Sequence, residues 1–457
     1  MPIEVIPILA LVVMFVAATV LPVNMGALGF VAAFIVGTIW VGMDADQIIG
    51  GFPSSLFLTL VGITYLFAIA QNNGTVDLLV RGAVRLVRGR VALIPWVMFG
   101  VTGLLTSIGA LGPAAVAIVA PIALGFASRY RIKPLLMGMM VVHGAQAGGF
   151  SPISIYGVTV NNIASKAGLV NSPLTLFLGS LFFNAAIGVA LFVFLGGREL
   201  IGRSVHDDDE LRPEGDTGAV GGGRSPATVM RGFGTTTTKA RSQAVTVENA
   251  PPLATAVKAI TIEQVLTLVG LASLAVFSLI LDLDVGFVSM TVAVILALVS
   301  PKAQKGAINQ ISWSTVLLIG GVLTFVGVLQ EAGTVEWVGH GVATLGAPLL
   351  VALLLCYIGA IVSAFASSTA ILGATIPLAV PFLMAGQVGA VGVIVALSIA
   401  STIVDVSPFS TNGALVLANA QGIDRDVFYK QILKYSAIVV AVGPLIAWAV
   451  LVLPGWF

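Results

Sequence analysis

Two copies of one short motif contain the residue types that could hold a small anion together with a cation. The motif is Ser-Pro-x-Ser-x-x-Gly, at residues 151–157 and again at 407–413, each time inside a long apolar stretch. Proline removes a backbone donor and disfavours helix in the residue before it, so each copy predicts an unwound turn within a helix. The N-termini of half-helices attract anions, and freed carbonyl oxygens attract Na⁺. The motif therefore predicts a binding site built from broken helices.

Asp405 stands two residues before the second motif, in apolar segments that otherwise hold almost no ionisable residue. A carboxylate inside a membrane is costly and usually functional, so we expect Asp405 to bind Na⁺ or H⁺. The structural alternative is a carboxylate that caps backbone amides at the helix break. His143 has the chemistry of a proton carrier, but we favour a hydrogen-bonded packing role for it. Gln146 is a weaker candidate for the same site.

The elements that must position these residues are membrane helices. The chain has 457 residues, of which 58% are hydrophobic and 9% are charged, whereas a soluble domain carries roughly 25% charged residues. A net charge of +1 gives no reason to expect nucleic acid as a partner. The single cysteine, Cys356, excludes an internal disulfide. These values predict a polytopic protein whose surface mostly faces lipid.

The apolar sequence divides into two matching blocks. The pattern Gln-x-x-Gly-Thr-Val followed by an acid occurs at 71–77 and 330–336, and Pro121 and Pro377 share with the two motifs a separation of 256 residues. Several matches in the same order predict an internal repeat. We expect a first repeat at 1–197, a flexible cytoplasmic linker at 198–258, rich in Gly, Thr and charge, and a second repeat at 259–457.

Each repeat predicts the same series of elements. The expected ranges are 6–22, 25–42, 54–71, 75–90 (interfacial), 91–128 (split), 134–168 (broken) and 173–196 in the first repeat, and 262–281, 284–300, 312–330, 334–347, 348–386, 388–422 and 431–453 in the second. The split ranges could be two crossings or one re-entrant hairpin. A break at Thr106–Pro113 without a polar loop favours the hairpin, with its tip buried in protein.

Charge then indicates how the repeats are inserted. Five crossings and a hairpin are an odd number of crossings, so a cytoplasmic linker requires inverted repeats. With this arrangement the inner segments hold 20 of the 21 Lys and Arg residues, and only Lys166 lies outside. The fold class we expect is an all-α polytopic membrane protein of two inverted repeats, each with five transmembrane helices and a re-entrant hairpin, with broken helices at the midplane. We place it in the plasma or inner membrane with both termini outside.

Several enzyme classes lack their sequence signatures. The chain has no GxxxxGK[ST] loop for ATP, no HExxH and no paired Cys/His set for a metal. We therefore expect no enzymatic activity and no cofactor, with Na⁺ only as a possible coupling ion. A membrane-embedded enzyme or receptor is the alternative from a different class.

Several stretches of the first third resemble the bacterial malonate/dicarboxylate carrier (MatC-type) family. They include LPVNMGALGFVAAFIVGT, GGFPSSLFLTLVGITYLFAIAQNNGTVDLLVRGAVRLVRGRVALIPW and GPAAVAIVAPIALGFASRYRI. The remainder is similar to the divalent anion/sodium symporter (DASS) group of the ion transporter superfamily. The resemblance implies homodimers, an elevator-like mechanism and cation-coupled uptake of dicarboxylates.

The resemblance also implies roles for individual residues. In the group each hairpin tip carries Ser-Asn-Thr; here the second tip is Ser367-Ser368-Thr369, and the first, Leu111-Gly112-Pro113, keeps none of the three. Ser107 and Ser363 match sodium ligands of the group, and the two Ser-Pro pairs match its Thr-Pro helix breaks. The predicted substrate-binding residues are Ser151, Pro152, Ser154, Ser367, Ser368, Thr369, Ser407, Pro408, Thr411 and Asn412. The predicted cation-binding residues are Ser107, Gly149, Ser363 and Asp405.

Taken together, the sequence predicts a secondary transporter that moves a small dicarboxylate such as malonate together with Na⁺ or H⁺. The first three spans of each repeat and the interfacial segments would form a dimeric scaffold, and the hairpins and broken helices a moving domain. The alternative within transport is a cation/proton antiporter or a carrier of another small anion.

Overall fold

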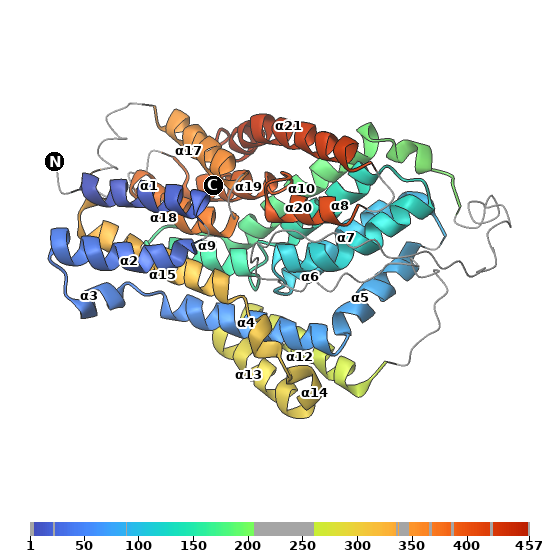
Figure 1. Cartoon of the computed structure of the whole chain (residues 1–457), viewed down its shortest axis with the longest axis horizontal. Helices are drawn as coiled ribbons and strands as arrows, with labels where there is room; N and C mark the ends of the chain where they lie inside the picture. The colour runs from blue at the N-terminus through green and yellow to red at the C-terminus, as the bar shows by residue number, and fades with distance from the viewer. Residues whose placement is uncertain are drawn as a thin grey trace, which may run out of the picture.

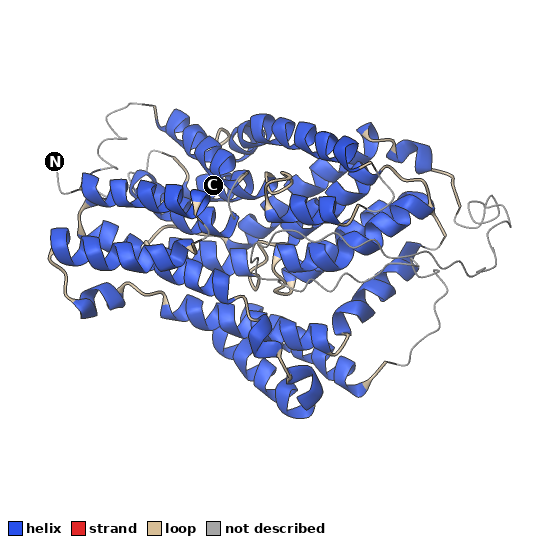
Figure 2. Cartoon of the chain, in the orientation of Figure 1, coloured by secondary structure: helices blue, strands red, loops and turns tan. Residues whose placement is uncertain are grey.

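Every regular element in the described part of the chain is a helix, as Figure 2 shows. The computed structural model describes residues 4–21, 23–87, 89–204, 260–334, 337, 347–364, 368–384, 388–420 and 424–455. Most of the predicted linker and of the second interfacial segment therefore lies outside the described residues. Six helices are long and apolar enough to cross a membrane, namely α4, α7, α10, α12, α15 and α21.

The helices lie where hydropathy predicts them. In the first half they are α1 (Val5–Val20), α2 (Met25–Val36), α3 (Ala45–Gly50), α4 (Ser54–Asn72), α5 (Thr75–Val84), α6 (Ile94–Ser107), α7 (Gly112–Arg129), α8 (Pro134–Gly148), α9 (Ile155–Lys166) and α10 (Pro173–Phe194). In the second half they are α12 (Ile262–Leu279), α13 (Val285–Val299), α14 (Pro301–Gln304), α15 (Trp313–Glu331), α17 (Pro348–Ser363), α18 (Ser368–Met384), α19 (Ala390–Ile403), α20 (Thr411–Ala418) and α21 (Arg425–Leu451). The short helix α3 was not predicted from the apolar pattern; it begins at a capping box formed by Asp44 and Gln47.

The two halves are interlocked through two close helix crossings. Helix α2 packs on α15, and α13 packs on α4 (Figure 1). A Cβ on Gly26 would lie 1.9 Å from the Leu317 carbonyl oxygen, and one on Gly321 would lie 1.8 Å from the Gly26 carbonyl oxygen. In the other crossing, a Cβ on Gly62 would lie 3.0 Å from the Gly286 carbonyl oxygen. Only glycine lets helix backbones approach this closely, so each crossing depends on its glycines.

The remaining helices pack around the two helix breaks. Helix α6 crosses α8 at small residues, since a Cβ on Gly148 would lie 1.9 Å from the Gly103 carbonyl oxygen. Helices α6 and α7 are joined by a turn at 108–111 in which Gly109 has φ +111° and Ala110 is 4% exposed. In Figure 1 the pair α6–α7 and the pair α17–α18 approach the breaks from opposite ends of the long axis.

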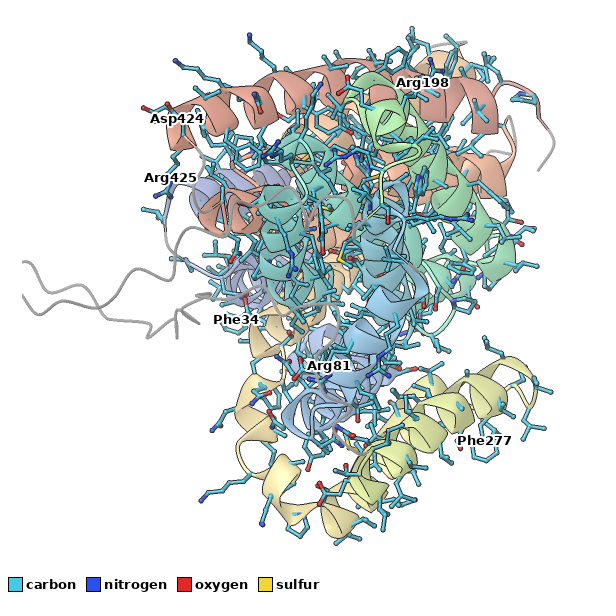
Figure 3. The ribbon with its side chains drawn as sticks, turned by 90° about the vertical axis from the view of Figure 1, so that its right-hand side faces the viewer. Phe34, Arg81, Arg198, Phe277, Asp424 and Arg425 are labelled. Carbon is cyan, nitrogen blue, oxygen red and sulfur yellow. The ribbon has the colours of Figure 1, made fainter. Side chains whose placement is uncertain are left out.

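The surface agrees with a lipid environment. Large apolar side chains are exposed, including Phe34, which is 61% exposed, and Phe277, which is 40% exposed. Basic residues instead gather at one end of the molecule. Figure 3 looks onto this end and shows Arg81 on α5, Arg198 in the 3-10 turn after α10, and Arg425 at the start of α21. An exposed apolar surface, together with basic residues at one end of the molecule, is typical of a polytopic membrane protein.

Candidate functional site

The first copy of the motif lies between the end of α8 at Gly148 and the start of α9 at Ile155, and this junction is called the first break. The Ser151 amide donates to the Gly148 carbonyl oxygen at 3.1 Å, and Pro152, which has no N–H, follows it. The Ser154 hydroxyl donates to the carbonyl oxygens of Gly149 and Ser151, at 2.6 and 2.7 Å. The same oxygen caps α9 by accepting from the Gly157 amide at 3.3 Å. Ser154 therefore closes the turn and starts the next helix.

The second break repeats this geometry 256 residues later. The Ser407 amide donates to the Val404 carbonyl oxygen at 3.1 Å. The Ser410 hydroxyl donates to the carbonyl oxygens of Asp405 and Ser407, both at 2.7 Å, and accepts from the Gly413 amide at 3.4 Å. Ser410 was not among the predicted site residues, although its place in the repeated motif was a sufficient signal for it.

Glycine is required at the end of both motifs. A Cβ on Gly157 would lie 2.0 Å from the Ser151 carbonyl oxygen, and one on Gly413 would lie 2.0 Å from the Ser407 carbonyl oxygen. Real Cβ atoms do not approach a carbonyl oxygen this closely. The spacing that the two motifs share thus has the same physical cause in both halves. The backbone at the Gly passes so close to the carbonyl oxygen of the first Ser that no Cβ fits between them.

The two breaks differ in the side chains that they hold. Asp405 is 5% exposed and accepts from the Asn412 amide at 2.8 Å. The corresponding residues of the first half are Gly149 and Tyr156. A Cβ on Gly149 would lie 3.3 Å from the Tyr156 ring. An aromatic ring therefore lies beside the backbone where the second half has a carboxylate and an amide.

Helix α18 and the end of α17 supply further oxygen atoms to Asp405. The side chains of Ser368 and Ser410 and the backbone of Asn412 lie within reach of its carboxylate. The Ser363 hydroxyl in turn donates to the Ser368 hydroxyl at 3.0 Å. The predicted Ser363, Ser368, Asp405 and Asn412 thus form one hydrogen-bonded group. Ser367 and the side chain of Thr369 lie outside what the structure describes.

The predicted residues of the first half form a separate and less polar group. The Ser151 hydroxyl donates to the Ser107 carbonyl oxygen at 2.6 Å, and the Ser107 hydroxyl donates to the Leu104 carbonyl oxygen at 2.8 Å. Leu111, Gly112 and Pro113 bring no side-chain polar atom to the start of α7. No ionisable residue takes part in the hydrogen bonds described here for this half.

Two contacts join the halves near the breaks, each between a helix of one half and the helix that follows the break of the other half. Helix α7 packs on α20, and α18 packs on α9. At the first of these contacts the Asn412 side-chain nitrogen lies 3.5 Å from where a Cβ on Gly112 would be. The other predicted residues of the second break are Pro408, which is buried, and Thr411, which is exposed. The N-termini of α7 and α20 therefore meet here, at Gly112 and Asn412.

His143 belongs to a polar cluster behind the first break. One ring nitrogen, Nδ1, lies 2.9 Å from the Asn184 side-chain oxygen, and the other, Nε2, lies 2.6 Å from the Tyr435 hydroxyl. Because the Asn184 amide nitrogen donates to the Ser180 carbonyl oxygen, its oxygen accepts from His143. His143 is thus held as a packing residue. Nothing in the sequence signalled Tyr435, which lies 292 residues away.

Gln146 has no such partners. Its side chain is 3% exposed, and neither its nitrogen nor its oxygen has a hydrogen-bond partner among the described residues. Its backbone carbonyl is well bound, since it accepts from the Ser180 hydroxyl at 3.0 Å and from the Gly149 amide at 3.2 Å. An unpaired buried amide is unfavourable, so this residue is a local weakness in the packing.

Two cavities lie along the boundary between helices α4 and α15 and the helices around the breaks. One of about 210 Å³ is lined by Gln330 of α15, Gly51, Val380 of α18, and Asn162 and Lys166 of α9, among others. A smaller cavity of about 50 Å³ is lined by Thr64 and Gln71 of α4, Gln310, Ser312, and Gly109 and Leu111 of the α6–α7 turn, among others. Gln71 and Gln330 belong to the second repeated pattern of the sequence, so each copy of that pattern lines one of the two cavities.

The oxygen-rich group around Asp405 could hold a small hard cation. It offers one carboxylate with neighbouring hydroxyl and amide oxygens, the ligand type that alkali and alkaline-earth ions prefer. Within the described chain no cluster of three or more His, Cys, Asp or Glu residues could hold a metal ion. The group therefore suits a monovalent cation or a proton better than a transition metal.

Comparison with known proteins identifies the N-terminal third. Residues 1–149 match the family described as the dicarboxylate carrier protein MatC N-terminus. No curated protein sequence matches the chain. A solved structure of the YdaH transporter from Alcanivorax borkumensis is similar over 89% of each chain, with 16% identity and a TM-score of 0.49, a likeness too distant to carry an argument. The resemblance found in the sequence is thus confirmed over residues 1–149, which are similar to the N-terminal part of the MatC-type dicarboxylate carriers.

Proposed function

We propose that the protein is a secondary active transporter that moves a small dicarboxylate such as malonate together with Na⁺ or H⁺. The family match supports a membrane transporter of the dicarboxylate carrier type rather than an enzyme. The observation that carries the finer proposal is the pair of helix breaks with one shared frame, one of which holds the buried carboxylate of Asp405. Unwound helices at the centre of a repeat are typical of transporter binding sites.

The proposed architecture is a pair of inverted repeats. The exchanged contacts support it, because α2–α15 is matched by α13–α4 and α7–α20 by α18–α9. Each of these pairs joins one half to the other. The basic end in Figure 3 supports one inner side that carries both Arg198, which follows α10, and Arg425, which begins α21. In this proposal the linker is cytoplasmic and both termini are outside.

The substrate would bind where the four helix N-termini converge. Unpaired amides at the start of a helix favour anions, and in this proposal α7, α9, α18 and α20 all begin at the site. The side chains that we propose to contact the carboxylates are those of Ser151, Ser154, Ser367, Ser368, Thr369, Ser407, Thr411 and Asn412, with Pro152 and Pro408 shaping the two turns. A site of neutral donors suits an anion that must also be released.

The coupling cation would bind beside the substrate at Asp405. Ser363 and Ser368 connect to this carboxylate through hydrogen bonds and would complete its ligand shell. Ser107 and Gly149, which the sequence predicts as cation ligands, occupy the corresponding positions of the first half.

Transport would proceed by an elevator-type movement of the helices around the breaks against α4 and α15. The two cavities between these groups of helices support such a sliding boundary, since packing there is incomplete. The homodimer remains a proposal. An exposed apolar groove of about 640 Å³ along α12 and α13 is a surface that lipid or a second copy would cover.

The test is uptake of radiolabelled malonate into proteoliposomes that contain the purified protein. Parallel samples carry an inward Na⁺ gradient, an inward H⁺ gradient or no gradient, and liposomes without protein are the control. We expect accumulation above equilibrium under one gradient, which names the coupling ion. Absence of uptake by folded protein under every gradient would exclude malonate symport.

The competing proposal is a cation/proton antiporter, because a lone buried carboxylate also suits alternating Na⁺ and H⁺. That function predicts a pH change inside Na⁺-loaded vesicles without any dicarboxylate. A pH-sensitive dye in the same vesicles, measured with and without malonate, separates the two functions.

A further inference from the structure

Of four corresponding positions of the site, three differ between the halves although the frame around them is the same, and only the first keeps its serine. Ser363, Ser368, Asp405 and Asn412 in the second half correspond, 256 residues earlier, to Ser107, Gly112, Gly149 and Tyr156. We propose that cation binding and substrate binding are linked through Asp405 and Asn412 alone, so that one cation accompanies each anion. This inference rests on the proposed function.

Asn412 has the contacts that a link requires. Its side-chain nitrogen donates to the Asp405 carboxylate at 2.8 Å and lies 3.5 Å from the Cβ position of Gly112, at the start of α7. Its side-chain oxygen is buried and has no hydrogen-bond partner among the described residues. The amide therefore lies between the only carboxylate of the site and the helix N-terminus that would receive the substrate anion.

The chemistry of an amide explains the direction of the coupling. While Asp405 is free, its negative charge holds the Asn412 N–H group and repels a second anion. A cation or proton on Asp405 neutralises that charge and releases the N–H group for a substrate carboxylate. By linkage, the cation then raises the affinity for substrate and the substrate raises the affinity for the cation by the same factor.

The first half lacks every part of this link. Gly149 has no side chain, and its carbonyl oxygen already accepts from Ser154. The Tyr156 ring lies 3.3 Å from where a Cβ on Gly149 would be. The Ser107 carbonyl oxygen likewise accepts from Ser151. In this proposal Ser107 and Gly149 serve to close the first break, whereas the sequence predicts them as cation ligands.

The first experiment compares two variants at corresponding positions. Asn412→Leu removes the amide at nearly constant volume, and Tyr156→Phe is the matched control that keeps the ring. The KM for malonate is measured at low and saturating concentrations of the coupling cation. We expect wild type and Tyr156→Phe to show a KM that falls by about 5-fold or more as the cation rises, and Asn412→Leu to show a KM that changes less than about 2-fold.

Folding of the variants is checked by size-exclusion chromatography and by thermal midpoints in detergent. If Asn412→Leu fails to fold, Asn412→Ser replaces it, since Ser keeps a small polar group but cannot span the distance to Asp405. Retention of the full cation dependence by a folded Asn412 variant overturns the link. A Tyr156→Phe variant that loses it as well overturns the assignment to one half.

The second experiment counts cations in wild-type protein. A divalent anion moving with one monovalent cation carries one net negative charge, so an inside-negative potential set by a K⁺ gradient and valinomycin should slow uptake. Two cations would make uptake insensitive to the potential, and three would make it faster; either result overturns the inference. If wild type takes up no malonate at all, the proposed function fails instead, and the two failures are thus distinguishable.

Discussion

The two helix breaks share a backbone frame and differ in what that frame holds. Ser154 and Ser410 make the same three hydrogen bonds, and Gly157 and Gly413 return onto the same carbonyl position. Only the second frame contains a carboxylate. The comparison teaches that the motif builds a turn of fixed shape, whereas the residues beside it decide whether the turn can bind an ion.

The largest effect is expected where the frame itself is broken. Gly157→Ala and Gly413→Ala each place a methyl group 2.0 Å from a carbonyl oxygen, which should cost about 3 kcal/mol or more. Both variants should lose monodisperse protein in size-exclusion chromatography after heating. Gly100→Ala, with open space around its Cβ, is the control. A tolerated change in only one half would show that the frames are not equivalent.

Asp405→Asn should separate the two halves by function. The variant keeps the shape of the side chain but removes its charge, so gradient-driven accumulation of malonate should fall by at least about 10-fold. Counterflow should persist, because the substrate contacts remain. Asp424→Asn at the exposed start of α21 is the control, since Asn also caps helices well. Undiminished accumulation by the Asp405 variant would contradict the proposed role.

Gln146→Met should stabilise the protein. The change removes an amide whose two polar atoms are unpaired among the described residues and keeps the side-chain volume, which should gain about 1–3 kcal/mol. The corresponding residue of the second half, Thr402, already donates to the Ser398 carbonyl oxygen at 2.9 Å. Thr402→Val should therefore lose about 1 kcal/mol. Thermal midpoints in detergent measure both, and a lower midpoint for Gln146→Met would mean that a ligand or water pairs this amide.

The smallest effects are expected at the capping serines. Ser154→Ala and Ser410→Ala should each cost about 1 kcal/mol through the lost cap. Because the Ser410 side chain also lies beside the Asp405 carboxylate, its replacement should cost slightly more stability than that of Ser154. Thermal midpoints of the two variants and of the double variant test this order. An equal loss would show that the carboxylate draws no stability from Ser410.

The sequence predicts the positions of the elements well, for physical reasons that are local. Apolar stretches long enough to span a membrane begin and end where the helices do, and Ser151-Pro152 and Ser407-Pro408 each mark an end of helix. The capping box at Asp44 was a usable signal for α3 that the apolar pattern concealed. Local chemistry thus determines most of the outline.

Contacts across the chain could not be predicted in this way. The Tyr156 ring beside Gly149, and Tyr435 on His143, depend on how helices rotate against each other once packed. Hydropathy carries no information about such rotation, because every face of these helices is apolar. The distinction between the halves at the site therefore required the structure, although the residues themselves were visible in the sequence.

The exchanged crossings of α2 with α15 and of α13 with α4 have a consequence for biogenesis. When the ribosome has delivered the first half to the membrane, α2 and α4 have inserted, but the glycine surfaces of Gly26 and Gly62 must wait for partners made more than 200 residues later. The first half therefore cannot complete its packing during its own synthesis. Final packing of this protein thus takes place after insertion, when the two halves assemble. Until the second half is inserted, the unpaired first half is accessible to quality-control proteases.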